Sequence, residues 1–388
     1  MQLLEVNTPE LVQEFLLFQV KLYKKDLNYI RPLDKDIESV FDPKKNKLLR
    51  SGEAIRWVLC DDKGKTIGRV AAFINKKTAN TYEQPTGGLG FFDCINDQQA
   101  ANLLFDTSRD WLKARGMEAM DGPINFGDRD RWWGLMVDGF HAPTYCMNYN
   151  APYYQQLFEN YGFEVYFKQF VYYRTVEEKL EPEVYRKATA ILENPDYHFQ
   201  HMNKKELKKY AEDFRTVYNK SWTKFEGVKA MSETHAMSIM NQLKPVLDER
   251  IVWFGYYKDE PISFFICLPE LNQLFKYTNG KLDLWGKLKF AYHRWKGDGK
   301  GMFGIVFGVA PEHQRKGVET AMVVSSSKII QNNPSIPYEE FQMNWIGDFN
   351  PKMMNVAVQV GGRIYKTYHS YRYLFDRTKE FKRMPVLS

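Results

Sequence analysis

The sequence is poor in cysteine and has none of the cysteine or histidine spacings that bind metal ions. Its four cysteines lie far apart in apolar or mixed surroundings, and they are Cys60, Cys94, Cys146 and Cys267. This pattern predicts buried, reduced thiols and argues against a disulfide framework or a zinc site. The seven histidines show no metal spacing either. We therefore expect no metal.

Long apolar runs are also missing. The first twenty residues contain Glu5, Glu10 and Glu14, so they have neither the basic start nor the unbroken apolar stretch of a signal peptide. No later run approaches the ~20 apolar residues that span a bilayer. These absences predict a cytoplasmic protein with no membrane partner.

The sequence has no blocks of like charge. Its net charge is +6, with acidic and basic residues mixed along most of the chain, so the overall charge does not argue for a nucleic-acid partner. Apolar residues make up 44% and charged residues 26%, which is typical of a globular protein. A length of 388 residues favours two domains, each with its own core.

What the sequence does contain is an internal repeat. Three residues recur at one constant separation of 200 positions: Asn150 with Asn350, Gly162 with Gly362 and Tyr173 with Tyr373. Both segments have the pattern of a helix, a glycine and an aromatic strand. Because glycine adopts the left-handed conformation without a Cβ clash, we predict that Gly162 and Gly362 end their helices.

The two halves also share their order of elements: helix, hairpin, strand, helix, strand, helix, strand. Thr8 before Pro9 predicts the start of the first helix, and Asn203 with Glu206 predicts the matching start in the second half. The pattern predicts an α+β fold with two tandem domains, each a mixed, mostly antiparallel sheet flanked by helices. The predicted parts are residues 1–175, a linker at 176–195, and residues 196–388 with an insertion at 272–300.

The segment from Val306 to Met322 has the strongest chemical signal. An apolar strand leads into a polar loop and then a helix, and the free amides at a helix start attract anions. Arg315 and Lys316 add positive charge, and Gly317 lets the backbone approach a ligand closely. A pyrophosphate would suit such a loop. The alternative is an ordinary polar loop at a helix start.

Gln314 to Val318 resembles the Gln/Arg-x-x-Gly-x-Gly/Ala motif of GNAT N-acetyltransferases, which wraps the pyrophosphate of CoA. Glu319 departs from the motif, because the family has Gly or Ala at that position. The resemblance implies that acetyl-CoA or another acyl-CoA is bound by Phe307, Gly308, Val309, Gln314, Arg315, Lys316, Gly317, Val318, Glu319 and Thr320. The first half has only Asn96 and Asp97 at the matching position, so we expect a single cofactor site, in the second half.

Acyl transfer needs a base for the amine and an acid for the leaving thiolate. By resemblance, the tyrosine acid of many family members falls at Val358 or Ala357, and neither can donate a proton. The strand from 301 to 310 has no carboxylate. The candidates for catalysis are therefore Asp348, Glu340 and Tyr365. The alternative interpretation is that Asp348 or Asn350 caps the last helix.

An irregular loop that starts at Gly122 is the most unusual stretch of the first half, and such loops often carry binding residues. The predicted substrate-binding residues are Asn125, Arg129, Trp132, Asn344 and Asn350, with Asp128 as a further candidate. Loop packing is the alternative for those of the first half. The insertion interleaves lysines with aromatic residues, which indicates a lid, a patch for an anionic partner or a solvated amphipathic helix.

The resemblance predicts an acyltransferase that moves an acetyl or other acyl group from acyl-CoA directly to an amine of a small-molecule acceptor, with no covalent intermediate. We expect a monomer or homodimer. One alternative is a Fem-type aminoacyl or peptidyl transferase that uses a charged tRNA or acyl carrier, and under this alternative alone we expect a nucleic-acid partner. Another is a non-catalytic acyl-CoA-binding module.

Overall fold

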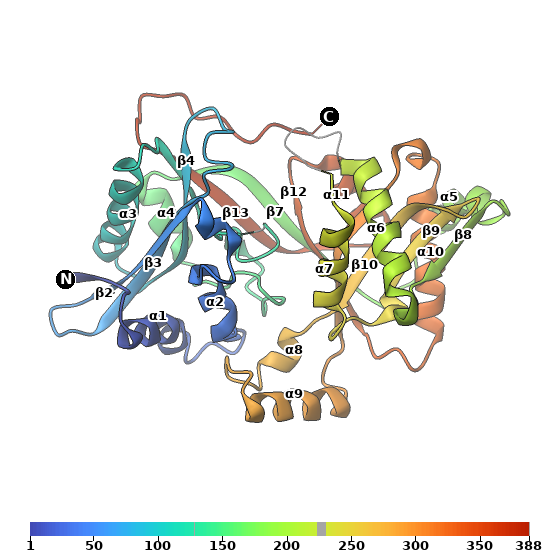
Figure 1. The fold of residues 1–388 in the computed structure, drawn as a ribbon, viewed down its shortest axis with the longest axis horizontal. Coiled ribbons are helices and arrows are strands. Elements are labelled where there is room, and N and C mark those ends of the chain that lie inside the picture. The colour runs from blue at the N-terminus through green and yellow to red at the C-terminus, as the bar shows by residue number, and fades with distance from the viewer. Residues whose placement is uncertain (128, 223–229, 388) are drawn as a thin grey trace.

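A single mixed sheet runs through both halves of the chain. The computed structural model describes residues 1–127, 129–222 and 230–387. Its 13 strands follow the order β1-β2-β3-β4-β5-β13-β7-β12-β11-β10-β9-β8, and β6 pairs with β13 beside this path. Helices cover both faces of the sheet (Figure 1). The fold is therefore the predicted mixture of sheet and flanking helices.

The predicted repeat of elements is confirmed, because the same order occurs twice. The first half comprises β1 (Gln2–Glu5), α1 (Pro9–Leu22), α2 (Asp34–Phe41), β2 (Glu53–Cys60), β3 (Thr66–Ile74), β4 (Thr86–Cys94), α3 (Gln98–Lys113), β5 (Ala119–Gly122), β6 (Leu135–Asp138), α4 (Tyr154–Tyr161) and β7 (Glu164–Thr175). The second half comprises α5 (Pro182–Leu192), β8 (Tyr197–His201), α6 (Leu207–Trp222), α7 (Glu233–Leu243), β9 (Val252–Tyr257), β10 (Glu260–Pro269), α8 (Asn272–Phe275), α9 (Leu284–Lys296), β11 (Gly301–Val309), α10 (Val318–Asn332), β12 (Glu340–Gly347), α11 (Pro351–Gln359) and β13 (Arg363–Leu374). The short strands β1, β6 and β8 were not predicted.

The predicted helix ends at Thr8 and Gly162 are confirmed. Thr8 Oγ1 accepts a hydrogen bond from the Leu11 amide at 3.4 Å, and Gly162 ends α4 with a φ of 105°. The prediction for Gly362 is wrong, because the left-handed residue is its neighbour Gly361, with a φ of 85°. Gly362 is small for another reason: a Cβ there would lie 2.7 Å from the Ala357 carbonyl oxygen.

The last strand of each half pairs with the other half. β13 is antiparallel to β5, with Tyr371 opposite Gly122, and β7 is antiparallel to β12, with Arg174 opposite Phe341. β7 and β13 also pair with each other in the middle of the sheet. The two halves therefore form one body, joined by a continuous sheet. The domain division at 176–195 stays a prediction.

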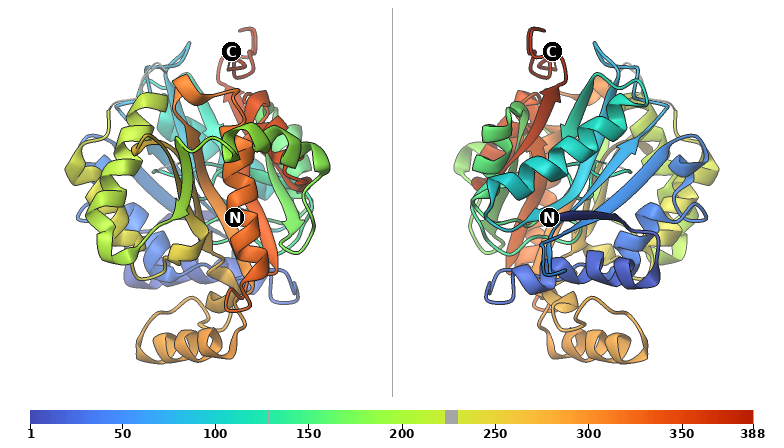
Figure 2. Two further views of the ribbon diagram at one scale, coloured as in Figure 1. Left: turned by 90° about the vertical axis from the view of Figure 1, so that its right-hand side faces the viewer. Right: turned by 90° about the vertical axis from the view of Figure 1, so that its left-hand side faces the viewer.

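The core lies in layers on both faces of the sheet (Figure 2). Alternate residues of β3 serve the two layers: Val70 and Ala72 pack with α3 and α4, whereas Ala71 and Phe73 pack with α1 and α2. In the second half, α6 and α7 cover one face and α5, α10 and α11 cover the other. The four cysteines are buried and free, as predicted.

Two helices lie within the segment predicted to be an insertion, and its status as an insertion stays a prediction. α8 and α9 lie between β10 and β11, whereas the matching connection of the first half, between β3 and β4, has no helix. α9 projects from the body at the bottom of Figure 1. Among the described helices, none is long and apolar enough to cross a membrane.

A buried ion pair fastens the exchanged strand β13 to the first half. The Arg372 guanidinium donates to both carboxylate oxygens of Asp121 on β5, at 2.6 and 2.8 Å. The two side chains are only 4% and 11% exposed, and the Tyr166 ring lies 3.6 Å from the guanidinium. Removing one partner leaves a buried charge without a counter-ion. The free-energy cost of that change exceeds the stabilisation that the intact pair provides.

We predict that Asp121→Asn lowers the free energy of unfolding by about 3–5 kcal/mol, because Arg372 stays buried without its counter-ion. Urea unfolding monitored by circular dichroism measures the change. Glu183→Gln is the matched control, since it removes the carboxylate of the exposed Arg186–Glu183 pair and should change nothing measurable. Equal losses in the two variants would contradict the role of the buried pair.

Candidate functional site

The sheet opens between β11 and β12. The two strands pair in parallel from Gly301 opposite Glu340 to Gly304 opposite Met343, and then separate. Ile305 is an extra residue in β11 at this level, and β12 has a register shift between Met343 and Ile346. Such irregularities bend strands and end their pairing. The result is a gap whose edges present backbone N–H and C=O groups to an extended ligand.

On one face, the gap leads to a basic cleft with a volume of 640 Å³. The start of α10, the preceding loop and α11 form its walls. Lining residues are Lys187, Phe307, Val309, Gln314, Arg315, Lys316, Gly317, Glu319, Thr320, Asn350, Lys352, Met353, Asn355, Val356 and Gln359. Four of them are cations and one is an acid, so the cleft attracts anions, and the positive end of the α10 dipole adds to this attraction.

Eight of the ten residues predicted to bind the cofactor line this cleft. The other two, Gly308 and Val318, are buried. Their backbone remains next to the cleft, because the residues before and after each of them line the cleft. The structure thus brings the predicted set together, and cofactor binding by these residues stays a prediction.

The loop before α10 has a specific backbone shape. Arg315 and Gly317 both have a positive φ, of 62° and 94°. The Gln314 side-chain amide donates to the Val309 carbonyl at 2.9 Å, and the Thr320 hydroxyl donates to the Gly317 carbonyl at 2.8 Å. A Cβ on Gly317 would collide with the Lys187 carbonyl oxygen on α5. Gly317 is therefore needed for packing against α5, a reason that the sequence did not reveal.

Glu319 places a carboxyl group in the basic cleft. It follows Val318 in the first turn of α10, and burial raises the pKa of its carboxyl group. Hydrogen bonds from the backbone of Glu319 and Arg315 lower that pKa to a smaller extent. The departure from the family motif thus puts one acid with a raised pKa among four cations.

On the opposite face, the gap leads to a mainly apolar cavity of 630 Å³ between the two halves. Its wall includes Phe303 and Ile305 of β11 and Asn344 and Trp345 of β12. The remaining lining residues are Lys35, Asp130, Arg131, Tyr145, Cys146, Gln242, Leu243, Pro245, Val246, Leu268, Leu271, Phe275, Leu282, Lys287 and Phe290. The charged groups come from the first half and from α9.

Of the predicted substrate-binding residues, Asn344 and Asn350 lie at the gap. Thr144 donates to the Asn344 Oδ1 atom at 3.1 Å, which fixes the orientation of the amide. Asn350 lines the basic cleft and caps α11, because its Oδ1 accepts the Met353 amide at 3.2 Å. Of the two residues predicted as possible caps of the last helix, Asn350 is the one that caps it.

The predicted substrate-binding residues of the first half line neither the cleft nor the apolar cavity. Asn125 and Trp132 are buried, and Trp132 packs against Phe91 with ring centroids 5.5 Å apart. Arg129 is exposed, and its guanidinium lies 5.6 Å from the Trp133 ring. Asp128 lies outside the described residues. Loop packing accounts for the described members of this set.

The three catalytic candidates also line neither space. Asp348 accepts the Lys168 amide at 3.1 Å and pairs with Arg383 at 2.5 Å. Glu340 accepts from Gln273 at 3.0 Å at the start of the parallel pairing. The Tyr365 ring stacks on the rings of Tyr173 and His141, at 4.8 and 4.1 Å. Each thus has a structural partner, and the catalytic roles stay predictions.

A buried polar junction that sequence reasoning missed supports the wall of the apolar cavity. Glu270 Oε1 accepts the amides of Tyr145, at 3.0 Å, and Asn272, at 2.8 Å. Lys366 Nζ donates to the Ala142 carbonyl at 2.7 Å and to the Gln342 side chain at 3.0 Å. Burial raises the pKa of Glu270 to about 7 and lowers that of Lys366 to about 8. No local motif connects these distant positions.

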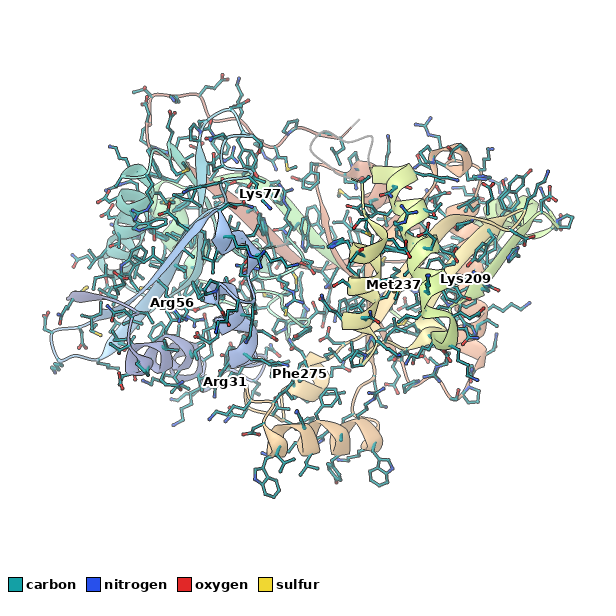
Figure 3. All side chains as sticks on the ribbon, viewed as in Figure 1. Arg31, Arg56, Lys77, Lys209, Met237 and Phe275 are labelled. Carbon is teal, nitrogen blue, oxygen red and sulfur yellow. The ribbon has the colours of Figure 1, made fainter. Side chains whose placement is uncertain are left out.

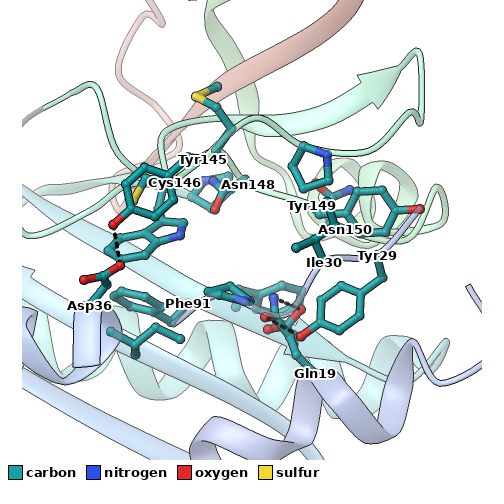
Figure 4. A pocket seen from close by; sticks show the side chains of 18 of the residues that line it. Gln19, Tyr29, Ile30, Asp36, Phe91, Tyr145, Cys146, Asn148, Tyr149 and Asn150 are labelled. Carbon is teal, nitrogen blue, oxygen red and sulfur yellow. Dashed lines mark hydrogen bonds between the residues drawn. The ribbon is translucent and has the colours of Figure 1, made fainter. Parts of the chain in front are cut away.

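The matching position of the first half is filled. A pocket of 40 Å³ lies there, and Figure 4 shows the Tyr145 hydroxyl donating to Asp36 across it. The fully buried Arg69–Asp93 ion pair, at 2.7 Å, forms part of its wall. At the start of α3, the Asp97 carboxylate accepts the Gln99 and Ala100 amides, at 2.8 and 3.1 Å. A protein carboxylate therefore accepts the amides at the start of this helix.

This architecture is that of tandem GCN5-related N-acetyltransferase (GNAT) proteins. A tandem GNAT protein from the clavulanic acid biosynthesis pathway matches with a TM-score of 0.56 and 10% identity, covering 97% of this chain and 99% of that protein. A glucosamine N-acetyltransferase region of a fungal multi-domain β-N-acetylglucosaminidase matches with a TM-score of 0.57 and 12% identity, covering 96% of this chain and 38% of that protein. The chain thus has the predicted tandem GNAT fold.

Two curated proteins resemble the chain along nearly its whole length. It is 25% identical over 380 residues to the bacterial ceramide synthase of Caulobacter vibrioides, covering 96% of this chain and 97% of that protein. It is 24% identical over 378 residues to protein YghO of Escherichia coli, covering 93% and 92%. No protein-family model matches the chain.

We predict that Gly317→Ala destabilises the protein more than Gly116→Ala does. Both glycines are left-handed, with φ of 94° and 81°, so each alanine carries the backbone cost of about 1 kcal/mol. A Cβ at position 116 has no neighbour within 4 Å, whereas one at position 317 collides with α5. Urea unfolding of the two variants measures the difference. Equal free energies of unfolding for the two variants would mean that α5 shifts to accommodate the added Cβ without destabilising the protein.

Proposed function

We propose that the protein is an N-acyltransferase that moves a fatty acyl group from acyl-CoA to the amine of a long-chain amino alcohol. The observation that carries the proposal is the meeting of a basic cleft and an apolar cavity at one gap in the sheet. The CoA phosphates would bind in the cleft, the thioester would lie in the gap, and the acceptor would occupy the cavity.

The relative's name supports this choice of acceptor. A ceramide is the amide of a fatty acid and a long-chain amino alcohol, so a ceramide synthase forms an N-acyl bond to such an amine. The similarity to the bacterial ceramide synthase covers nearly all of both chains at 25% identity. A mainly apolar cavity of 630 Å³ is suited to a lipid acceptor and would give a small polar amine few contacts.

A second, apolar pocket supports a long acyl chain on the donor. It has a volume of 70 Å³ and lies between α10, α11 and the sheet. Phe307, Met353 and Val356 line both this pocket and the basic cleft. Its deeper wall includes Val323 and Ile330 of α10. The first carbons of an acyl chain longer than acetyl would leave the polar cofactor cleft here.

The proposed transfer is direct. The acceptor amine attacks the thioester carbon, a C–N bond forms, the C–S bond breaks, and the amine proton is balanced by protonation of the leaving thiolate. Because Thr144 occupies the Oδ1 atom of Asn344, the opposite end of that amide, Nδ2, is available to donate to the thioester carbonyl. Asp348, Glu340 and Tyr365 remain the candidates for proton transfer.

Thiol release tests the reaction. The purified protein is mixed with palmitoyl-CoA or acetyl-CoA and with sphinganine or ethanolamine, and the product is identified by mass spectrometry. We expect CoA release and N-acyl sphinganine with palmitoyl-CoA, and little turnover with ethanolamine. Absence of turnover with every pair would contradict the proposal and leave the predicted non-catalytic module. A requirement for charged tRNA as the donor would favour the Fem-type alternative.

Opposite charges in the basic cleft yield opposite effects on cofactor affinity. We predict that Lys316→Gln weakens acyl-CoA binding by about tenfold, because a charge-assisted phosphate contact is lost. Glu319→Gln should strengthen binding by roughly two- to fivefold, because it removes a negative charge beside the phosphates at a helix start. Isothermal titration calorimetry measures both. Lys328→Gln, on the exposed side of α10, should leave the affinity unchanged.

A charge in the apolar cavity should affect the acceptor and spare the donor. We predict that Ile305→Glu raises the KM for sphinganine at least tenfold, because it places a carboxylate against an alkyl chain, while palmitoyl-CoA affinity stays within about twofold. Ile364→Glu is the matched control, since Ile364 is also an exposed isoleucine but lies outside this cavity. A KM change of similar size in both variants would contradict the acceptor site.

A further inference from the structure

The insertion helix α9 exposes a stripe of large apolar side chains. These residues are between 52% and 83% exposed, and they are Leu284, Trp285, Leu288, Tyr292 and Trp295. With 3.6 residues per turn, all five fall within an arc of about 100° on one side of the helix. Exposed tryptophans at both ends of one helix are not expected on a surface that faces only water.

The other side of α9 is fixed to the protein, so the direction of the stripe is defined. The Phe290 ring packs on Phe275 of α8, with centroids 5.3 Å apart, and the His293 ring stacks on Tyr277 at 3.4 Å. Figure 3 labels Phe275, which lies between α9 and the two halves. Asp283 caps the helix start by accepting the Gly286 amide at 2.8 Å. The stripe therefore points away from the body.

Cations flank the apolar stripe on both sides. On the helical period, Lys289 and Lys296 lie along one border of the stripe, and Lys287 and Arg294 lie along the other. Residues 281–300 contain six basic and two acidic residues, a large share of the chain's net charge of +6. An apolar stripe with aromatic rings and bordering cations is typical of helices that lie in the interface of an anionic membrane.

The helix also lies at the mouth of the proposed acceptor cavity. Phe290 and Lys287 line the 630 Å³ cavity from the inner side of α9. Phe290, Arg294 and Trp295 line a neighbouring space of 320 Å³ that shares Leu271 with it. A lipid that leaves a bilayer beneath α9 would therefore meet the cavity without crossing water.

We propose that α9 docks the protein on an anionic membrane surface and holds the acceptor cavity against the lipid from which the amine is drawn. None of the described helices is long and apolar enough to cross a membrane, and the proposal concerns contact with the membrane surface. The docking is inferred from the apolar stripe and the cations that flank it. Its role in supplying the acceptor rests on the proposed function.

Vesicle sedimentation tests the docking without any assay of activity. The full chain is mixed with vesicles of phosphatidylcholine alone or with phosphatidylglycerol, and the bound fraction is measured with salt varied. We expect binding to the anionic vesicles that weakens as salt increases. Failure to bind them would overturn the docking. Conversion of a dimer to a monomer by changes in the stripe, with no vesicle binding, would instead identify it as a contact between copies.

Two pairs of variants separate the contributions of the stripe and its cations. Trp285→Ser with Trp295→Ser should lower the partition coefficient at least tenfold, and Leu27→Ser with Tyr185→Ser is the control with exposed apolar residues elsewhere. Lys289→Glu with Lys296→Glu should also lower it at least tenfold, and Lys63→Glu with Lys65→Glu is the control with the same change in net charge. Equal losses in a variant and its control would overturn the assignment to α9.

Presentation of the acceptor links docking to transfer. With sphinganine in anionic vesicles, the α9 variants should lose most of their acylation rate, whereas in detergent micelles they should retain the wild-type rate. Vesicle binding without acylation of any amine would overturn the proposed function and leave the docking intact. Acylation from vesicles that is unchanged in both α9 variants would overturn the supply role.

Discussion

The pairing of β7 with β13 in the centre of the sheet is the constraint on which the rest of the structure depends. Each strand ends one half of the chain and completes the sheet of the other, so neither half has a finished sheet alone. β7 also holds one side of β12, and β12 forms one wall of the gap. The gap therefore keeps its width only while both halves are folded together, with Arg372 and Asp121 fastening the exchange.

The gap brings two surfaces of opposite character within the thickness of one sheet. Cations and a helix start define one face, and apolar side chains from both halves define the other. The first half carries the same strand order, but Arg69 and Asp93 form a buried ion pair in its interior and Asp97 caps its helix. One half thus serves as a wall for the other, and the segment with α9 extends that wall outward to the exposed apolar stripe.

Several features followed from the sequence because their causes are local. The repeat, the Thr8 cap, the Gly162 stop and the loop at 314–317 each depend on neighbours within a few residues, and backbone geometry alone gives them a pattern. The assignment of Gly362 failed because two adjacent glycines carry the same local signal, and only packing against Met343 and Ala357 decides which one is left-handed.

The sequence by itself determined the order of elements, the tandem repeat and the single segment with a phosphate-binding pattern. Only the tertiary structure decided the exchange of strands, the Glu270–Lys366 junction, the position of Asn344 at the gap and the outward direction of the α9 stripe. The physical reason is the separation along the chain between the residues that make each contact. Turns and caps arise from contacts a few residues apart, whereas a cavity wall and the exposure of a helix face depend on which distant segments pack against them.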